Sequence, residues 1–267
     1  MRKILQLLAA ALTVSLAVAG RQSFGQDQYR HTDAQSVRDF RDGNIAYEKA
    51  KVLYGKKDLP GARKELLAAL RLAPRHSDAH LLMAKILYSE KDYTQALTEV
   101  VAAKDGFEAN VAFMEQMQQE RMNHLLRLSR EKEETIASLN VQLSQTSPDG
   151  RFAIENQIAE ATRKKADIDR QRERPPDLGR EIPAEYFFIH GNILLRTQKY
   201  PEAAAQYDEA LKRKPDYGDA ANNLASLYYS ARQYDKALAV VEKAEKNGAT
   251  VNPELKKAIQ NDLAKPK

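Results

Sequence analysis

The chain has few residues arranged for chemistry, and its five histidines are the first candidates. His76 and His80 are four residues apart, so a helix would place both imidazoles on one face, where they could bind a metal ion such as zinc. However, His76 falls in an expected turn just before Ser77, the expected helix cap, and no acidic third ligand has an obvious place. His190 falls at a position that must pack. We therefore predict no metal site.

Motifs for catalysis are also missing from the sequence. The chain contains no Cys, which excludes a thiolate nucleophile and thiolate metal ligands. It has no Gly-rich phosphate loop, no G-x-S-x-G and no H-E-x-x-H. Paired carboxylates such as Glu133 and Glu134 fall on an expected exposed helix surface. We predict that the protein is not an enzyme and uses no cofactor.

The elements that position the remaining residues are expected to be helices. The 267 residues are 43% hydrophobic and 30% charged, Gly and Pro are scarce, and strong helix formers dominate. The formal net charge of +5 is too small to indicate nucleic acid as a partner. The basic run 163–174 is expected to be a solvated helix face, because no aromatic residues interleave for base stacking.

The first twenty residues predict export. Arg2 and Lys3 precede the uncharged apolar run 4–19, which ends in an A-x-A cleavage pattern. The run is shorter than the roughly 20 residues that a membrane-spanning helix needs. We expect a cleaved signal peptide over 1–20 and a periplasmic or secreted protein. The alternative is an uncleaved anchor in the inner membrane with the chain facing the periplasm.

A repeat of 34 residues organises most of the chain. Ala203, Tyr207, Ala210 and Pro215 define a template. The same spacing recurs at Ala62, Leu66, Ala69 and Pro74, and without the proline at Ala96, Val100 and Ala103 and at Ala237, Val241 and Ala244. Two antiparallel helices approach closely only where the crossing residues are small, and proline ends the second helix.

This pattern resembles the tetratricopeptide repeat (TPR) family. The resemblance covers residues 43–108 (repeats 1 and 2) and 184–251 (repeats 3 and 4). It implies an all-α TPR α-solenoid in which stacking of neighbours completes the core. Asn252 and Pro253 open a predicted capping helix over 252–265. Residues 21–42 are polar, and we expect them to be partly disordered.

Residues 109–178 do not match the repeat and predict an antiparallel helical hairpin. Two stretches without Gly or Pro, 110–145 and 151–174, flank the turn sequence TSPDG. Their apolar residues follow a coiled-coil-like spacing that would pair Leu143 with Ile154. Lys132 and Lys165 would then face each other and loosen the seam. The hairpin is either an enlarged repeat that keeps the solenoid continuous or an arm for oligomerisation or partner capture.

The TPR resemblance implies a concave groove lined by the first helix of each repeat. Tyrosines and apolar rings mixed with Lys, Asn and Arg suit an extended or helical peptide. The predicted groove residues are Tyr47, Lys51, Tyr54, Leu81, Lys85, Tyr88, Phe188, Asn192, Arg196, Asn222, Asn223 and Tyr229. Asn192 and Asn223 match the two Asn positions of TPR clamps for a C-terminal carboxylate, but Phe188 stands where that clamp needs Lys.

Together these features predict an exported, non-enzymatic adaptor or assembly factor of the cell envelope. Its partner would be a protein or peptide held in the groove. The alternative is a structural protein that forms homo-oligomers through the hairpin.

Overall fold

Small residues at the helix crossings are fully buried, as the repeat requires. In the computed structural model, which describes residues 34–173 and 181–265, Ala62, Ala96, Ala203 and Ala237 are all 0% exposed. The bulkier residue four positions later is equally buried in each repeat: Leu66, Val100, Tyr207 and Val241. The predicted signal segment 1–20 lies outside the described residues.

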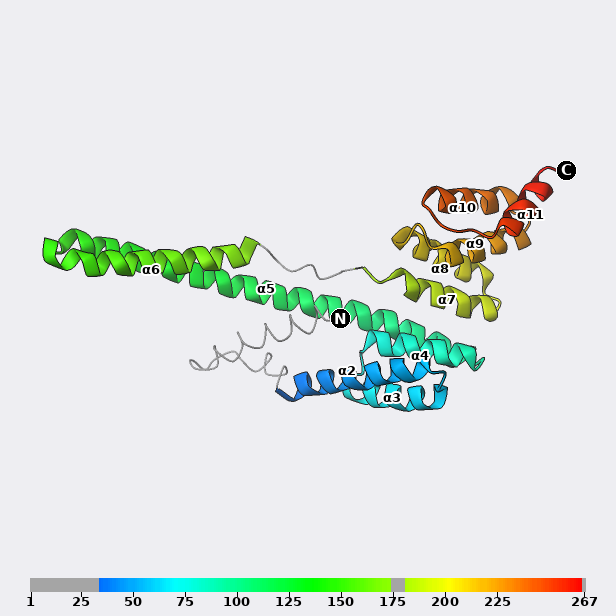
Figure 1. The fold of residues 1–267 in the computed structure, drawn as a ribbon, viewed down its shortest axis with the longest axis horizontal. Helices are drawn as coiled ribbons and strands as arrows, with labels where there is room; N and C mark the ends of the chain where they lie inside the picture. The colour runs from blue at the N-terminus through cyan, green and yellow to red at the C-terminus, as the bar shows by residue number, and fades with distance from the viewer. Residues whose placement is uncertain (1–33, 174–180, 266–267) are drawn as a thin grey trace. The chain divides into compact units, whose positions relative to one another are not determined.

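Each repeat is a pair of antiparallel helices (Figure 1). The pairs are α2 (Ala34–Gly55) with α3 (Leu59–Leu72), α4 (Ser77–Ser89) with the start of α5 (Tyr93–Gln145), α7 (Ala184–Arg196) with α8 (Tyr200–Arg213), and α9 (Gly218–Ser230) with α10 (Tyr234–Lys246). The remaining helices are α6 (Pro148–Glu173) in the hairpin and α11 (Pro253–Leu263) after the last repeat. The predicted all-α solenoid of four repeats, interrupted by a helical hairpin, is confirmed.

Helix ends follow the expected signals in part. α3 and α8 both end before their proline, and the Asn252 side chain caps α11 by accepting a hydrogen bond from the Glu254 backbone N–H. α2 instead begins at Ala34, upstream of the expected repeat start at residue 43. None of the helices in the described ranges is long and apolar enough to cross a membrane.

The turn inside each repeat has the same left-handed residue. Lys57, Lys91, Gln198 and Arg232 have φ between 57° and 65°. The residue after each of them donates its backbone N–H to a carbonyl five positions back, as Asp58 does to Leu53. This bond satisfies a carbonyl at the end of the first helix, as in a Schellman motif. The positive φ therefore recurs without glycine, at a small cost in backbone strain.

One hydrophobic core joins the two pairs of repeats. Buried side chains form a single cluster from Ala46 in α2 to Leu224 in α9. Ile182, just before α7, belongs to this cluster and fixes the point where the chain re-enters the solenoid. A second cluster lies between α9, α10 and α11, with Ile259 of α11 fully buried. α11 therefore covers the C-terminal end of the stack.

The described residues form two compact units. One contains the repeats, in residues 34–109 and 181–265, and the other contains the hairpin, from residue 110 to residue 173. α5 contributes to both, because it continues without a break through Gly106. A Cβ at Gly106 would lie 2.8 Å from the Arg75 carbonyl oxygen. Glycine is thus needed here for close approach of the inter-repeat turn, and it does not end the helix.

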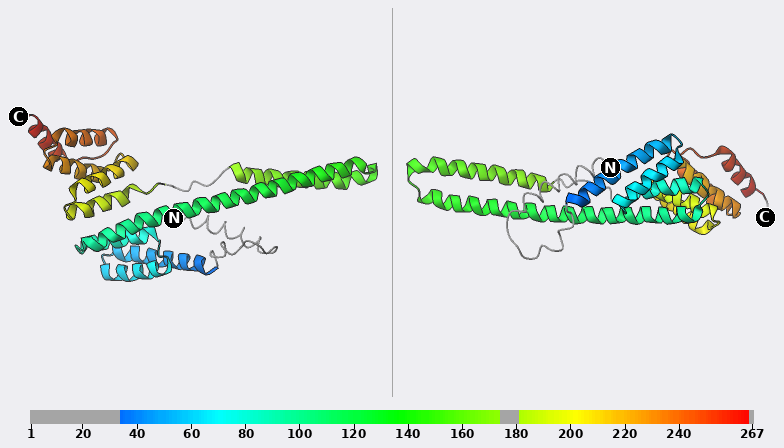
Figure 2. Two further views of the ribbon diagram at one scale, coloured as in Figure 1. Left: turned by 180° about the vertical axis from the view of Figure 1, so that it is seen from behind. Right: turned by 90° about the horizontal axis from the view of Figure 1, so that it is seen from below.

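Within the hairpin unit, α6 runs beside the later part of α5 in every view (Figures 1 and 2). Ile154 and Ala161 are buried, and Leu139 and Leu143 are half-buried. Where lysines were expected to face each other, the structure has a polar cluster: the Asp169 carboxylate accepts hydrogen bonds from Ser129, Lys165 and Arg172. Lys165 is thus paired with an acid on its own helix, and the seam is held there by polar contacts.

The crossing of Gly191 and Tyr207 gives a test of the packing. A Cβ at Gly191 would lie 2.6 Å from the buried Tyr207 ring. Gly191→Ala should therefore destabilise the protein by about 1–3 kcal/mol, despite a gain of about 1 kcal/mol in helix propensity. Urea unfolding followed by circular dichroism measures the change.

Gly55→Ala is the matched control, because the added methyl group at the end of α2 meets nothing within 4 Å. It should be neutral or stabilise by up to about 1 kcal/mol. Equal stability of the Gly191→Ala variant and the unmodified protein would show that the crossing tolerates a larger residue.

Candidate protein-binding surface

The twelve predicted groove residues lie on the first helices of the repeats, α2, α4, α7 and α9, and we call their surface the helix-A face. Lys51 and Arg196 are exposed, and most of the others are half-buried. Tyr47 and Leu81 are only 9% and 5% exposed. These two side chains belong to the core, so they support the helix-A face and offer little contact area.

At the junction of repeats 2 and 3, predicted binding residues join α4 to α7. The Lys85 ammonium forms an ion pair with Glu185, and the Arg196 guanidinium donates to the Tyr88 hydroxyl at 3.1 Å. That hydrogen bond raises the pKa of Arg196 further. Since these partners are about 100 residues apart in sequence, no local pattern could have revealed them.

At the junction of repeats 3 and 4, the two asparagines contact each other. The Asn192 side-chain oxygen accepts hydrogen bonds from the Tyr207 hydroxyl at 2.8 Å and from the Asn223 amide at 2.9 Å. Phe188 packs against Tyr217 with the two rings tilted by 41° and their centroids 4.9 Å apart. The asparagine pair thus holds the repeats together, and the absence of Lys at position 188 leaves the carboxylate clamp incomplete.

The last junction follows the same principle. The Tyr229 hydroxyl donates to the Asp262 carboxylate of α11 at 2.6 Å, and the Asn222 side-chain oxygen accepts from the Asn252 backbone N–H at 2.8 Å. Lys51, at the other end of the face, pairs with Glu48 on its own helix and lies 5.5 Å from the centre of the Tyr47 ring. Contact surface therefore remains at Lys51, at the half-buried Tyr54 ring and on the outward side of Arg196.

The histidine pair in the turn between repeats 1 and 2 has a structural role. His76, and not the expected Ser77, caps α4: its Nδ1 accepts from the Ala79 N–H, and its Nε2 donates to the buried Asn44 oxygen. Burial lowers the pKa of His76, and the ring is neutral. In His80 both nitrogens face acceptors, the Glu99 carboxylate at 2.6 Å and the Pro74 carbonyl at 2.9 Å.

Both ring nitrogens of His80 can donate to these acceptors only when the ring is protonated, so the arrangement favours the imidazolium. Burial alone would lower its pKa, but the hydrogen bonds to Glu99 and Pro74 outweigh that effect and raise it. Both rings of the pair thus use their nitrogens within the fold. In the described ranges no group of three or more His, Cys, Asp or Glu residues is placed to hold a metal ion.

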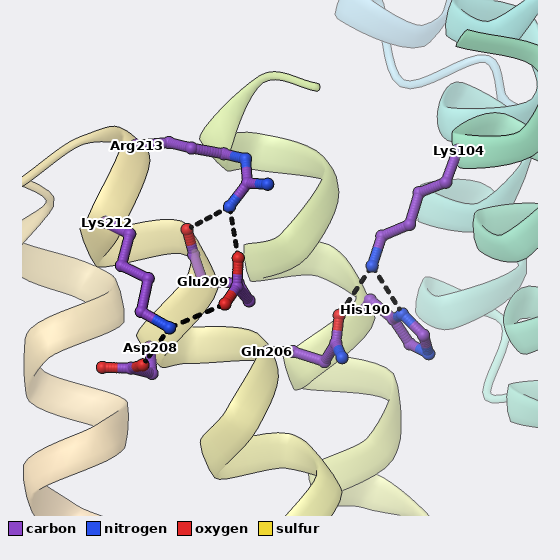
Figure 3. Close-up of polar contacts among 7 residues, drawn as sticks. All are labelled: Lys104, His190, Gln206, Asp208, Glu209, Lys212 and Arg213. Carbon is purple, nitrogen blue, oxygen red and sulfur yellow. Dashed lines mark hydrogen bonds and ion pairs between the residues drawn. The ribbon is translucent and has the colours of Figure 1, made fainter. Parts of the chain in front are cut away.

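A second polar cluster, which the sequence did not predict, lies at the junction of repeats 2 and 3 (Figure 3). The Lys104 ammonium of α5 contacts the His190 Nδ1 at 3.0 Å and the Gln206 oxygen at 2.6 Å. Lys104 and Arg213 each lie 4.0 Å from the centre of the Phe187 ring. His190 is thus an interface residue, in line with the expectation that it must pack.

This environment shifts two ionisations. Burial, and then the charge of Arg213, lower the pKa of Lys104 to about 8. Burial, and then the charge of Lys104, lower the pKa of His190 to about 4. The neutral His190 ring can accept a hydrogen bond from the Lys104 ammonium, whereas an imidazolium would place two cations in contact.

Pairs of antiparallel helices are stacked into an α-solenoid, and their first helices present a mixed aromatic and polar helix-A face. This arrangement defines the class of protein as a helical repeat protein. A sequence profile described as "Tetratricopeptide repeat" matches residues 47–106 and 190–251. These two stretches are therefore tetratricopeptide repeats, a fold that mediates protein–protein interactions.

Similar proteins extend the comparison. Hsp70-Hsp90 organizing protein 1 of Glycine max is 34% identical over 86 residues, 32% of this chain. The match covers only 14% of that protein's length. Among solved structures, Pseudomonas aeruginosa pilF is 16% identical with a TM-score of 0.35, and the match covers 85% of this chain and 87% of that one.

PilW, described as a type IV pilus biogenesis factor, is likewise 16% identical, with a TM-score of 0.37 over 83% of this chain and 86% of that one. The yeast Sti1 TPR2AB domain, solved as a complex with pHSP90, is 16% identical with a TM-score of 0.26, over 82% and 96% of the two chains. All three TM-scores are below 0.5.

The ionisation of His190 gives a pH test. Its folded pKa of about 4 lies below the unfolded value of 6.5, so its contribution to stability is full above pH 6.5 and is lost as the pH falls toward 4. In the His190→Gln variant, the loss of unfolding free energy between pH 7 and pH 4.5 should be about 2 kcal/mol smaller than in the unmodified protein. Urea titrations at several pH values measure this.

His80→Gln is the control with the opposite sign. Because the folded pKa of His80 is raised, its ion pair with Glu99 contributes fully below pH 6.5 and is lost as the pH rises through the folded pKa. In the His80→Gln variant, the unfolding free energy should therefore fall more steeply between pH 7 and pH 4.5 than in the unmodified protein. Identical pH profiles for the His190→Gln variant and the unmodified protein would contradict the assignment of His190.

Proposed function

We propose that the protein is an exported, non-enzymatic adaptor of the cell envelope that binds a protein or peptide segment along the helix-A face. One observation carries the proposal. After the repeats have been joined, the face still offers aromatic and cationic surface at Tyr54, Tyr88, Lys51 and Arg196. Tyr and Arg are the residue types that contribute most to protein interfaces.

The geometry favours a ligand with hydrogen-bond acceptors near its centre. Arg196 is anchored through Nε to the Tyr88 hydroxyl, and the Tyr88 ring lies against Tyr93 at 5.6 Å. The guanidinium is thereby anchored at Nε, while Arg196 as a whole remains exposed. A backbone carbonyl or carboxylate of an extended segment is the complementary group.

The cellular location is proposed from the sequence alone. The basic start, the apolar run and the A-x-A pattern in residues 1–20 support export with signal cleavage. The surface described above requires no membrane span. An adaptor in the periplasm or cell envelope would be exported and would bind its partner without spanning a membrane.

Site-specific photo-crosslinking in cells tests the binding surface. A photoreactive phenylalanine analogue placed at Lys51 or Ser226, both exposed on first helices, should give a discrete adduct with one partner. The same analogue at Asp208 or Glu242, exposed on second helices, is the matched control and should not. Mass spectrometry of the envelope fraction identifies the adduct.

The adduct must also depend on the proposed contacts. Combining Lys51→Ala with Arg196→Ala should reduce the Ser226 adduct about tenfold while the melting temperature changes little, because both side chains are exposed. Adducts of equal yield from first and second helices, or an adduct insensitive to these substitutions, would place the partner elsewhere.

The hairpin supports a second candidate function, self-association. Phe152 and Val141, near its turn, are 73% and 59% exposed. Large apolar side chains with this exposure suit an interface with a second copy. This proposal retains the alternative in which the protein is a structural homo-oligomer.

Light scattering of residues 21–267 separates the two functions. If the hairpin self-associates, the protein should have twice the monomer mass at micromolar concentration, and Phe152→Glu with Val141→Glu should restore the monomer. Glu155→Gln, an exposed change on the same helix, should leave the mass unchanged. A monomer at all concentrations would rule out the hairpin as an oligomerisation device.

A further inference from the structure

The outer side of α2 lacks the cover that every later repeat has. Ile45 and Val52 are 50% and 56% exposed, although both are large aliphatic residues in a well-formed helix. They are seven residues apart, so they lie on one face of α2, with Lys49 between them. Together, Ile45, Lys49 and Val52 form what we call the α2 outer face.

The repeat period identifies what is missing from this face. Positions equivalent to Ile45 are Ala79, Tyr186 and Ala220, and positions equivalent to Val52 are Ile86, Ile193 and Leu227. Five of these six residues are at most 2% exposed, and Leu227 is half-buried. These positions are therefore more exposed in repeat 1 than in repeats 2, 3 and 4.

The second helix of the preceding repeat provides that cover. In repeat 3, Tyr186 packs edge-on against Phe107 of α5 at 5.9 Å, and His190 contacts Lys104 of the same helix. His190 is the equivalent of Lys49. An occupant of the α2 outer face would thus be a helix that lies where a preceding second helix would lie, with one of its side chains opposite Lys49.

The lysines on and beside the α2 outer face indicate which kind of helix would bind there. Lys49 is exposed, as is Lys56 one turn beyond Val52, and within the described residues neither has an ion pair. The equivalent positions Met83 and Leu224 are apolar and nearly fully buried. An occupant therefore has to cover two aliphatic side chains and satisfy lysines that the fold leaves unpaired.

The opposite end of the solenoid shows the contrast. There α11 covers α10 and buries Ile259, and the surface beyond it is largely polar, as terminal repeats need for solubility. The α2 outer face, at the N-terminal end of the solenoid, exposes Ile45 and Val52 where a terminal repeat needs polar surface. We propose that it is a docking site for an amphipathic helix of another protein, with apolar residues seven apart and acidic residues beside them.

A peptide taken from this chain provides the probe. Residues 92–109 form the second helix of repeat 2, whose Phe107 and Lys104 already cover a first helix. In a fluorescein-labelled copy with Lys104→Glu, a carboxylate would face Lys49. Fluorescence anisotropy with residues 21–267, which include all described residues, should show saturable binding below about 1 mM.

Substitutions on the α2 outer face should then control the affinity. Ile45→Glu with Val52→Glu should weaken binding at least about tenfold, because the apolar contact is lost. Lys49→Glu should weaken binding of the Lys104→Glu peptide and strengthen binding of the unmodified peptide, since the facing charges are exchanged. Val101→Glu, at an aliphatic residue that is 41% exposed on a second helix, is the matched control and should have no effect.

Two results would overturn the proposal. One is the absence of binding up to about 1 mM, or binding that the double substitution leaves unchanged. The other is a dimer in light scattering that Ile45→Glu with Val52→Glu converts to a monomer, which would make a second copy the occupant. Neither result bears on the helix-A face, because none of these substitutions lies on it.

Discussion

The close crossing of two helices at a small residue is the contact on which the rest of the structure depends. Ala62, Ala96, Ala203 and Ala237 are completely buried, so in a close-packed interior a longer side chain there would have to displace its neighbours. This contact fixes how each helix is rotated about its axis. The rotation in turn decides which residues face the core, which face the next repeat and which form the helix-A face. In repeat 3 the facing residue is also small: Gly191 has no side chain where the large Tyr207 ring packs against it.

The insertion leaves this stack intact because the chain departs along a helix and returns to a buried anchor. α5 serves as the second helix of repeat 2 before it enters the hairpin, so the core contact at Ala96 is complete before the insertion begins. Ile182 then brings α7 back onto repeat 2, where Tyr186 donates to Asp78 at 2.6 Å. Closing a longer loop costs only slightly more entropy, so a few such contacts suffice.

Periodicity in the sequence predicted the helices well, because buried positions recur at fixed spacing and each repeat has the same neighbours. Contacts that depend on a single partner were not predictable. The cap at His76 relies on Asn44, which is 32 residues away, and the cluster around Lys104 joins three helices that are brought together only by stacking. The boundary expected at residue 109 did not indicate that α5 continues unbroken from repeat 2 into the hairpin, with Gly106 inside it next to the Arg75 carbonyl.

Several of the predicted binding residues hold neighbouring repeats together, and this would affect any binding on the helix-A face. The sequence identified Lys85, Asn192 and Tyr229 from their positions on first helices, but it could not show that each of them bonds to the first helix of the next repeat or to α11. A ligand on the helix-A face would therefore contact the side chains that hold neighbouring repeats in register. Binding that strengthened these contacts would stabilise the stack by mass action, and binding that competed for them would loosen it. Recognition on this face would thus be coupled to the packing between repeats, whereas the α2 outer face carries no such contact among the described residues and could be covered without disturbing the solenoid.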